Sequence, residues 1–267
     1  MFHTHDPRDV HPMAIARAIS GGPVYISDEP SKIVPDVLYP FAYADGRLLR
    51  TKAPATLLPE SFFVHPFRDK EVFRVVAPLE DNVAAIALFN FSEGGEALDS
   101  QFDAKDYSHA GELLLPDGEP WSESEEGLLV YDREAKTVSE LKEAFASNIP
   151  NFDARLYLVY PKTQGWAVIG RVDKYLPAAA VKVSSVTQDK ISFTLKESGP
   201  LMVWSEHGRP TMDGITFKPA GQSVYVAELP NGGEREMTLS RVAPQSLIQN
   251  RGSRQPTPQA RNGGRQH

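Results

Sequence analysis

Apolar residues recur at helical spacing only near the start of the chain. The positions from Met13 to Ile19 follow this spacing, and Pro12 suits a first helical turn, where its missing N–H would be unpaired anyway. Gly21 predicts the end of the helix, because glycine adopts the left-handed conformation at little cost. The run Pro23–Asp28 then predicts a short apolar strand, so this region has the pattern of an α/β unit.

From residue 66 onward the pattern changes to short apolar runs separated by turn residues. Ile191–Leu195 alternates between apolar and polar side chains, as a half-buried strand does. Within this region only Val138–Ala146 has a helical pattern. Before the region, in the first 65 residues, Asp36–Tyr43 predicts a second, weak helix. Strands are predicted over Val72–Ala77, Val83–Phe91, Gly127–Asp132, Arg155–Tyr160, Trp166–Val172, Ala179–Val186, Lys190–Leu195, Leu201–Trp204, Gly214–Lys218 and Ser223–Leu229.

These patterns divide the chain into three parts. Residues 1–65 hold the helix and strand, and residues 66–245 predict an antiparallel β-sandwich. Residues 246–267 carry four arginines and no acid, with much Gln, Pro and Gly, which predicts a disordered tail. A basic interaction arm is the alternative for this last part.

Composition narrows the class of protein. The net charge of −7 argues against binding to nucleic acid, and no apolar run is long enough to span a bilayer. Cysteine is absent, which excludes disulfides, thiolate metal sites and a cysteine nucleophile. It also fits a reducing compartment, so we expect a cytoplasmic protein without membrane partners.

The α/β unit carries a family motif. The stretch from Ala16 to Pro30, ARAISGGPVYISDEP, resembles a segment of the raffinose synthase and α-galactosidase group, glycoside hydrolase family 36. In that group the segment crosses from the seventh helix of a TIM barrel into the eighth strand. Met1–His3 resembles the end of the group's Asp-x-Asp-Met-Phe motif, and Ala44–Arg50 resembles a further group segment.

The resemblance implies a mixed fold, in which the last βα units of a TIM barrel precede an antiparallel β-sandwich. It implies retaining chemistry on α-galactosides with two catalytic aspartates, which by the family pattern would precede Met1. We therefore expect this chain to be the C-terminal part of such an enzyme and to have no glycosidase activity alone. Another polypeptide could supply the rest of the barrel. The alternatives are a stand-alone carbohydrate-binding sandwich and a non-catalytic structural remnant.

The resemblance also implies substrate-binding residues. Ser27 and Asp28 would lie at the C-terminal end of the eighth strand and His3 at that of the seventh, where barrel active sites form. For Asp28 the alternative is an Asp-x-Pro turn. For His3 it is a solvated histidine near the chain end.

Two further features of the sequence bear on ligand binding. Trp121 lies in a polar loop and is a candidate for stacking on a sugar, whereas Trp166 and Trp204 lie in apolar runs typical of a core. His3 and His5, with Asp6 and His11 nearby, have the spacing of a metal pair. Such a pair needs a preceding apolar strand and further ligand-bearing strands, so we expect neither a metal nor a cofactor.

Overall fold

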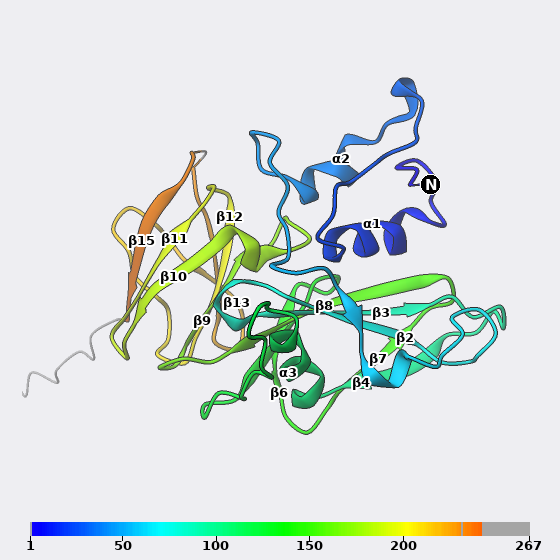
Figure 1. The fold of residues 1–267 in the computed structure, drawn as a ribbon. Coiled ribbons are helices and arrows are strands. Elements are labelled where there is room, and N and C mark those ends of the chain that lie inside the picture. Colours follow the sequence, from blue (N-terminus) through cyan, green and yellow to red (C-terminus); the bar gives the residue numbers. More distant parts are fainter. Residues whose placement is uncertain (1, 231, 242–267) are drawn as a thin grey trace, which may run out of the picture.

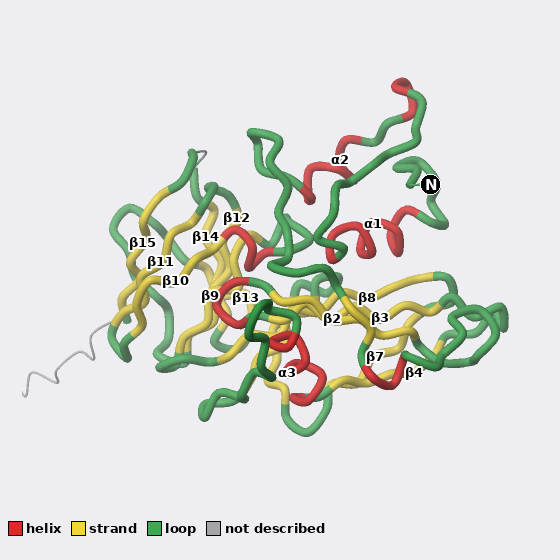
Figure 2. Tube along the Cα trace, viewed as in Figure 1, coloured by secondary structure: helices red, strands yellow, loops and turns green. Residues whose placement is uncertain are grey.

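The computed structural model describes residues 2–230 and 232–241, which form mostly antiparallel sheets with few helices (Figures 1 and 2). The predicted tail at 246–267 lies outside the described residues. The helices are α1 (Val10–Ile19), α2 (Pro35–Leu38) and α3 (Ala104–Glu112). Short 3-10 turns lie at η1 (Pro30–Lys32), η2 (Tyr39–Phe41), η3 (Pro59–Ser61), η4 (Glu80–Asn82) and η5 (Pro177–Ala180).

A six-stranded antiparallel sheet is the base of the N-terminal half, with the strand order β1-β2-β3-β8-β5-β6. A two-stranded ribbon of β4 and β7 lies beside it. The bounds are β1 (Thr56–Leu57), β2 (Phe73–Pro78), β3 (Ala84–Asn90), β4 (Leu98–Phe102), β5 (Leu128–Asp132), β6 (Thr137–Leu141), β7 (Phe145–Ile149) and β8 (Asp153–Pro161).

The six-stranded sheet separates two hydrophobic cores. Every residue of β3 is buried, and successive side chains point to opposite faces. Ala85 and Ala87 belong to the core on the α1 face, whereas Ile86 and Leu88 belong to the core that includes Tyr107 of α3. Figure 1 shows α1 above this sheet and α3 below it. A strand covered on both faces explains the near-continuous apolar run in its sequence.

Helix α1 packs on β8 and β3 with its apolar stripe, including the fully buried Ala14 and Ile15. It ends as predicted: Gly21 has φ +68°, the left-handed conformation that glycine favours. The predicted strand Pro23–Asp28 joins no sheet in the structure. It is an extended segment with Tyr25 74% exposed, whereas Val24 and Ile26 pack against the core. The helix and the segment after it thus bury their apolar side in the core on one face of the six-stranded sheet.

The C-terminal half is a second group of two sheets. Their strand orders are β13-β14-β12-β9 and β10-β11-β15, and all the pairs are antiparallel. The predicted Lys190–Leu195 strand is confirmed with its alternating burial. The bounds are β9 (Trp166–Arg171), β10 (Val181–Val186), β11 (Lys190–Leu195), β12 (Pro200–Ser205), β13 (Lys218–Gly221), β14 (Val224–Glu228) and β15 (Arg235–Ser240).

The loop after α2 joins the N-terminal segment to this second group. The backbone N–H of Tyr175 donates to Pro40 O at 3.1 Å, and the Tyr43 hydroxyl donates to Ala179 O at 3.0 Å. Glu197 accepts from the backbone N–H of Ala44 at 2.7 Å. These contacts fix residues 39–48, so the first 60 residues are held by both groups of sheets.

Some expectations need correction. The helix predicted over Val138–Ala146 is wrong, because these residues belong to β6, β7 and the turn between them. The strand predicted at Gly214–Lys218 is displaced, and β13 begins at its last residue. The antiparallel β part of the predicted fold is confirmed. In the described residues every strand pair is antiparallel, so the barrel end remains a proposal, as do the boundaries at residues 65 and 245. In that same part of the chain, no helix has the length and apolar character needed to cross a membrane.

Candidate functional site

Two segments that are far apart in the sequence lie side by side near the start of α1. The backbone N–H of Ser27 donates to Phe2 O at 2.9 Å. Phe2 is buried and packs edge-on against Phe41, with ring centroids 6.2 Å apart. The buried ring fixes the first segment, and the residues that follow it, His3 to His5, are thereby placed beside Asp28.

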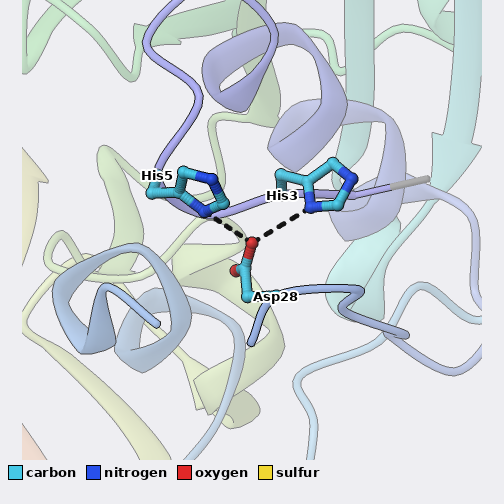
Figure 3. Close-up of side chains that lie close together, drawn as sticks. All are labelled: His3, His5 and Asp28. Carbon is cyan, nitrogen blue, oxygen red and sulfur yellow. Dashed lines mark hydrogen bonds and ion pairs between the residues drawn. The ribbon is translucent and has the colours of Figure 1, made fainter. Parts of the chain in front are cut away.

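The Asp28 carboxylate is the centre of this arrangement. Its Oδ2 accepts from the backbone N–H of Thr4 at 2.8 Å and from the Thr4 hydroxyl. Its Oδ1 lies 3.1 Å from His3 Nδ1 and 2.7 Å from His5 Nδ1 (Figure 3). The side chain of Asp28 is inaccessible to solvent, at 0% relative exposure. Both carboxylate oxygens are therefore engaged by neighbours within the chain.

These contacts also set the ionisation state of Asp28. Burial raises its pKa, but the hydrogen bonds from Thr4, His3 and His5 outweigh burial and lower the pKa to about 2. The carboxylate is therefore ionised at neutral pH and cannot serve as a general acid there. Its main effect is to orient the two imidazoles.

A small cavity of about 220 Å³ adjoins the cluster. His3 and His5 are 39% and 41% exposed, so each ring has a solvent-facing edge. Glu29 forms an ion pair with Lys32 at 3.3 Å beside them. The lining residues are His3, His5, Asp6, Ser27, Glu29 and Lys32. Such a polar lining can exchange hydrogen bonds with the hydroxyls of a small ligand.

The structure therefore brings three of the four predicted binding residues together. His3 and Ser27 line the cavity, and Asp28 supports it from inside. Trp121 lies elsewhere, partly buried against the second core, with its ring centroid 5.4 Å from that of Tyr107. A binding role for each of these residues stays a prediction. The sequence-based set does not include His5, whose ring lies 5.7 Å from that of His3 in the structure.

The other residues near the histidine pair have separate positions. Asp6 lines the cavity without joining the cluster at Asp28. His11, on α1, places Nδ1 2.6 Å from Asp153 and Nε2 3.2 Å from Glu134. Its side-chain hydrogen bond with Glu134 raises its pKa against the effect of burial. His11 thus anchors the helix on the sheet.

One group can hold a metal ion by geometry. The ligand atoms of His3, His5 and Asp28 all lie within 4.8 Å of one another. The third ligand beside the two histidines is thus Asp28. Asp6 and His11 lie closer to the pair in the sequence but do not belong to the group.

Comparison with known proteins confirms the resemblance expected from the sequence. Residues 1–113 match the family described as "Raffinose synthase or seed imbibition protein Sip1". This range includes the whole cluster at Asp28 and its cavity. Over its first 113 residues the chain is therefore similar to the raffinose synthase family.

Curated relatives agree with this family. A probable galactinol–sucrose galactosyltransferase 1 from Arabidopsis thaliana is 27% identical over 143 residues, which are 52% of this chain and 15% of the relative. The galactinol–sucrose galactosyltransferase of Pisum sativum is 31% identical over 109 residues, which are 40% of this chain and 13% of that enzyme. Each match thus spans only a small part of the relative's length.

Two solved structures also resemble this chain. α-Galactosidase I from Mortierella vinacea has a TM-score of 0.38 and 12% identity, over 59% of this chain and 36% of that one. An isomalto-dextranase from Arthrobacter globiformis has a TM-score of 0.39 and 16% identity, over 89% of this chain and 46% of that one.

Proposed function

We propose that this chain takes part in the transfer or hydrolysis of α-galactosyl groups, as the C-terminal part of a retaining enzyme. In this proposal residues 1–65 are the end of the enzyme's barrel, and the cavity at His3 and Ser27 binds hydroxyls of an α-galactoside. The family match over residues 1–113 and the galactosyltransferase relatives support the class of reaction.

The observation that carries the proposal is the pairing of the two N-terminal segments. Phe2 lies beside Ser27 and Thr4 beside Asp28, so the two segments run in the same direction. A barrel builds its active face from polar side chains at the C-terminal ends of adjacent parallel strands, and the two segments have the same relative direction although neither forms a strand here. The cavity opens at these ends, next to His3 and Ser27.

Asp28 has a supporting role in this proposal. A retaining glycosidase needs a nucleophilic carboxylate and an acid/base carboxylate about 5–5.5 Å apart. Asp28 is inaccessible to solvent, accepts hydrogen bonds on both oxygens, and has a pKa of about 2. It suits neither role. In this proposal the two catalytic aspartates follow the family pattern and lie on barrel strands outside this chain, supplied by another polypeptide or by an upstream part of the same gene.

The first test is catalytic. The purified chain, incubated with an aryl α-galactoside, should release no aryl alcohol above a mock purification from the same host. Hydrolysis that copurifies with the chain and persists in Asp28→Asn would contradict the expected inactivity. It would place a catalytic pair elsewhere in the sequence.

The second test is binding. Ligand-observed NMR with raffinose should detect weak, about millimolar, binding to the chain. His3→Ala should remove it, because His3 lines the cavity. His65→Ala, at an exposed histidine that does not line the cavity, should leave the binding unchanged. No detectable binding, or equal binding by both variants, would contradict the role of the cavity.

The alternative is a stand-alone carbohydrate-binding sandwich that uses Trp121. The geometry favours it less, because the indole packs against Tyr107 and against α3 at Gly111. A Cβ added at Gly111 would lie 2.5 Å from Trp121 Cδ1. Raffinose binding that is lost in Trp121→Ala and kept in His3→Ala would favour this alternative.

A further inference from the structure

The three side chains at the start of the chain point their ligand atoms at one spot. His3 Nδ1 and His5 Nδ1 face the same oxygen, Asp28 Oδ1, at 3.1 and 2.7 Å. The two imidazole rings are 5.7 Å apart and inclined at 67°, so they approach this oxygen from different directions (Figure 3). Two nitrogens and one carboxylate oxygen therefore converge, with an open side toward the cavity.

The carboxylate is fixed in the orientation that such a site needs. Thr4 holds Asp28 Oδ2 through its backbone N–H and its hydroxyl. The Thr4 hydroxyl in turn accepts from the backbone N–H of Val34 at 2.8 Å, and Thr4 is only 3% exposed. Because Oδ2 is occupied, Oδ1 is left to face the histidines. Contacts of this kind, behind the ligands, are what orients the groups of a metal site.

We propose that His3 Nδ1, His5 Nδ1 and Asp28 Oδ1 bind a divalent transition-metal ion of the Zn²⁺ class. Two imidazoles and one carboxylate are a ligand set that zinc accepts, in tetrahedral geometry with a fourth position open to water or another oxygen ligand. The fourth position would face the cavity of about 220 Å³. The inference concerns the cluster itself and does not depend on the galactoside proposal.

The observed spacing needs only a small adjustment. Ligand atoms about 2.0–2.1 Å from a tetrahedral zinc lie about 3.3 Å from one another. The two nitrogen–oxygen distances here are 3.1 and 2.7 Å, so modest rotations of the partly exposed imidazoles open the site. In the metal-bound form each neutral imidazole would carry its proton on Nε2, so that Nδ1 binds the ion in place of its hydrogen bond with Asp28.

The contrast with His11 shows that the arrangement is specific. His11 also contacts two carboxylates, but Asp153 lies at Nδ1 and Glu134 at Nε2, on opposite sides of the ring. Three ligands in that order cannot surround one ion. The group at Asp28 differs because both imidazoles present the same nitrogen to one oxygen.

The test is a titration of the full chain with Zn²⁺ against a chromophoric chelator. We expect one ion per chain, and at least about tenfold weaker binding in His5→Gln and in His3→Gln. Removing a residue that only hydrogen-bonds a metal ligand already lowers metal affinity by about tenfold or more, and removing a ligand itself should lower it further. His5 is 41% exposed, so His5→Gln should fold normally, as circular dichroism would verify. His65→Gln, a change at an exposed histidine outside the cluster, is the matched control and should bind as the parent chain does.

Two further measurements sharpen the result. Co²⁺ should give a visible absorption band of four-coordinate nitrogen and oxygen ligation, which His5→Gln removes. The same titration on chain acetylated at its N-terminus excludes chelation by a terminal amine. The proposal is overturned if the parent chain binds no Zn²⁺, if acetylation alone abolishes binding, or if His65→Gln weakens binding as much as His5→Gln.

Discussion

His11 connects α1 to the six-stranded sheet through two carboxylates. The Glu134 hydrogen bond raises the pKa of His11 from its usual 6.5, although burial acts against it. For the two carboxylates burial acts in the other direction and raises the pKa values of Glu134 and Asp153. Their hydrogen bonds with His11 and other donors outweigh burial and lower both pKa values. All three groups are therefore stabilised in their charged forms, and their contribution to folding depends on pH.

This gives a prediction for the pH profile of stability. The contribution of His11 is complete below its unfolded pKa of 6.5 and is lost as pH rises through its raised folded pKa. The contributions of Glu134 and Asp153 to stability are present above their unfolded pKa values of 4.5 and 3.8. They are lost as the pH falls through the lowered pKa values of the folded state. The cluster should thus contribute most between pH 4.5 and 6.5.

Thermal unfolding of the parent chain and of His11→Gln, from pH 4 to pH 9, checks the prediction. The difference in melting temperature should be largest near pH 5.5 and should shrink toward pH 9. A His109→Gln variant, whose histidine pairs with Glu112 on the surface of α3, should show a much smaller difference. A constant difference across the whole range for His11→Gln would contradict the assignment.

At the residue scale the sequence predicted where polar side chains gather, but only part of how they act. The family resemblance placed His3, Ser27 and Asp28 at the ends of two neighbouring barrel strands, and the structure brings these residues together. That Asp28 is enclosed by Thr4 and both histidines depends on side-chain orientation, which no spacing in the sequence records. The same holds for the partners of His11, which lie more than a hundred residues away.

Among the elements, α3 shows how a local signal was missed. Its nine residues have few apolar side chains, so the periodicity is weak, but Asp103 and Asp106 form a reciprocal capping box at its start. Over Val138–Ala146 the local sequence predicts a helix that the structure does not form. Charged residues such as Glu140 and Lys142 favour a helix, yet pairing of β6 with β5 decided the outcome. Tertiary pairing overrode local propensity there.

The capping box gives the second prediction. The Asp103 side chain accepts from the backbone N–H groups of Lys105 and Asp106. Asp103→Ala therefore removes the side-chain acceptor of two N–H donors in the first turn of α3. We expect a loss of about 0.5–2 kcal/mol in the free energy of unfolding. Urea unfolding measures it, with Asp117→Ala, at an exposed loop position, as the control expected to change it by less than about 0.5 kcal/mol. Equal effects of the two changes would contradict a capping role.

At the scale of the whole molecule, one core runs through both groups of sheets. It includes Ile15 of α1, Leu156 of β8 and Phe193 of β11. Around it, residues 39–48 bridge the N-terminal segment to the C-terminal sheets. The first α/β unit must pack on another surface, because a single unit cannot bury its own apolar side. Which surface it borrows follows from contacts between residues over a hundred positions apart, which no local pattern contains.

A buried network of ion pairs stabilises the contact between residues 39–48, called the bridge below, and the C-terminal sheets. Arg171 donates to both oxygens of Asp173, at 2.8 and 2.7 Å, and to Glu197 at 3.0 Å. Its side chain is 6% exposed. Lys174 lies beside it and donates to Tyr39 O at 3.0 Å, and burial lowers the pKa of this lysine. Glu197 also accepts from Ala44 in the bridging loop, so removal of Arg171 should disturb the loop as well as the sheet.

The last prediction concerns Arg171→Ala. Breaking a buried ion pair on one side leaves the partner charges unpaired and costs about 3–5 kcal/mol. Asp173 is 37% exposed and can be solvated, so we expect a loss near 3 kcal/mol in the free energy of unfolding, measured in urea. Arg47→Ala is the matched control, because Arg47 pairs with Asp45 at 73% and 51% exposure, and such surface pairs contribute about 0–1 kcal/mol. If Arg171→Ala costs no more than Arg47→Ala, the network does not hold the bridge. If it costs more, hydrogen exchange should also quicken at Ala44 and Tyr175, whose N–H groups bond across the bridge.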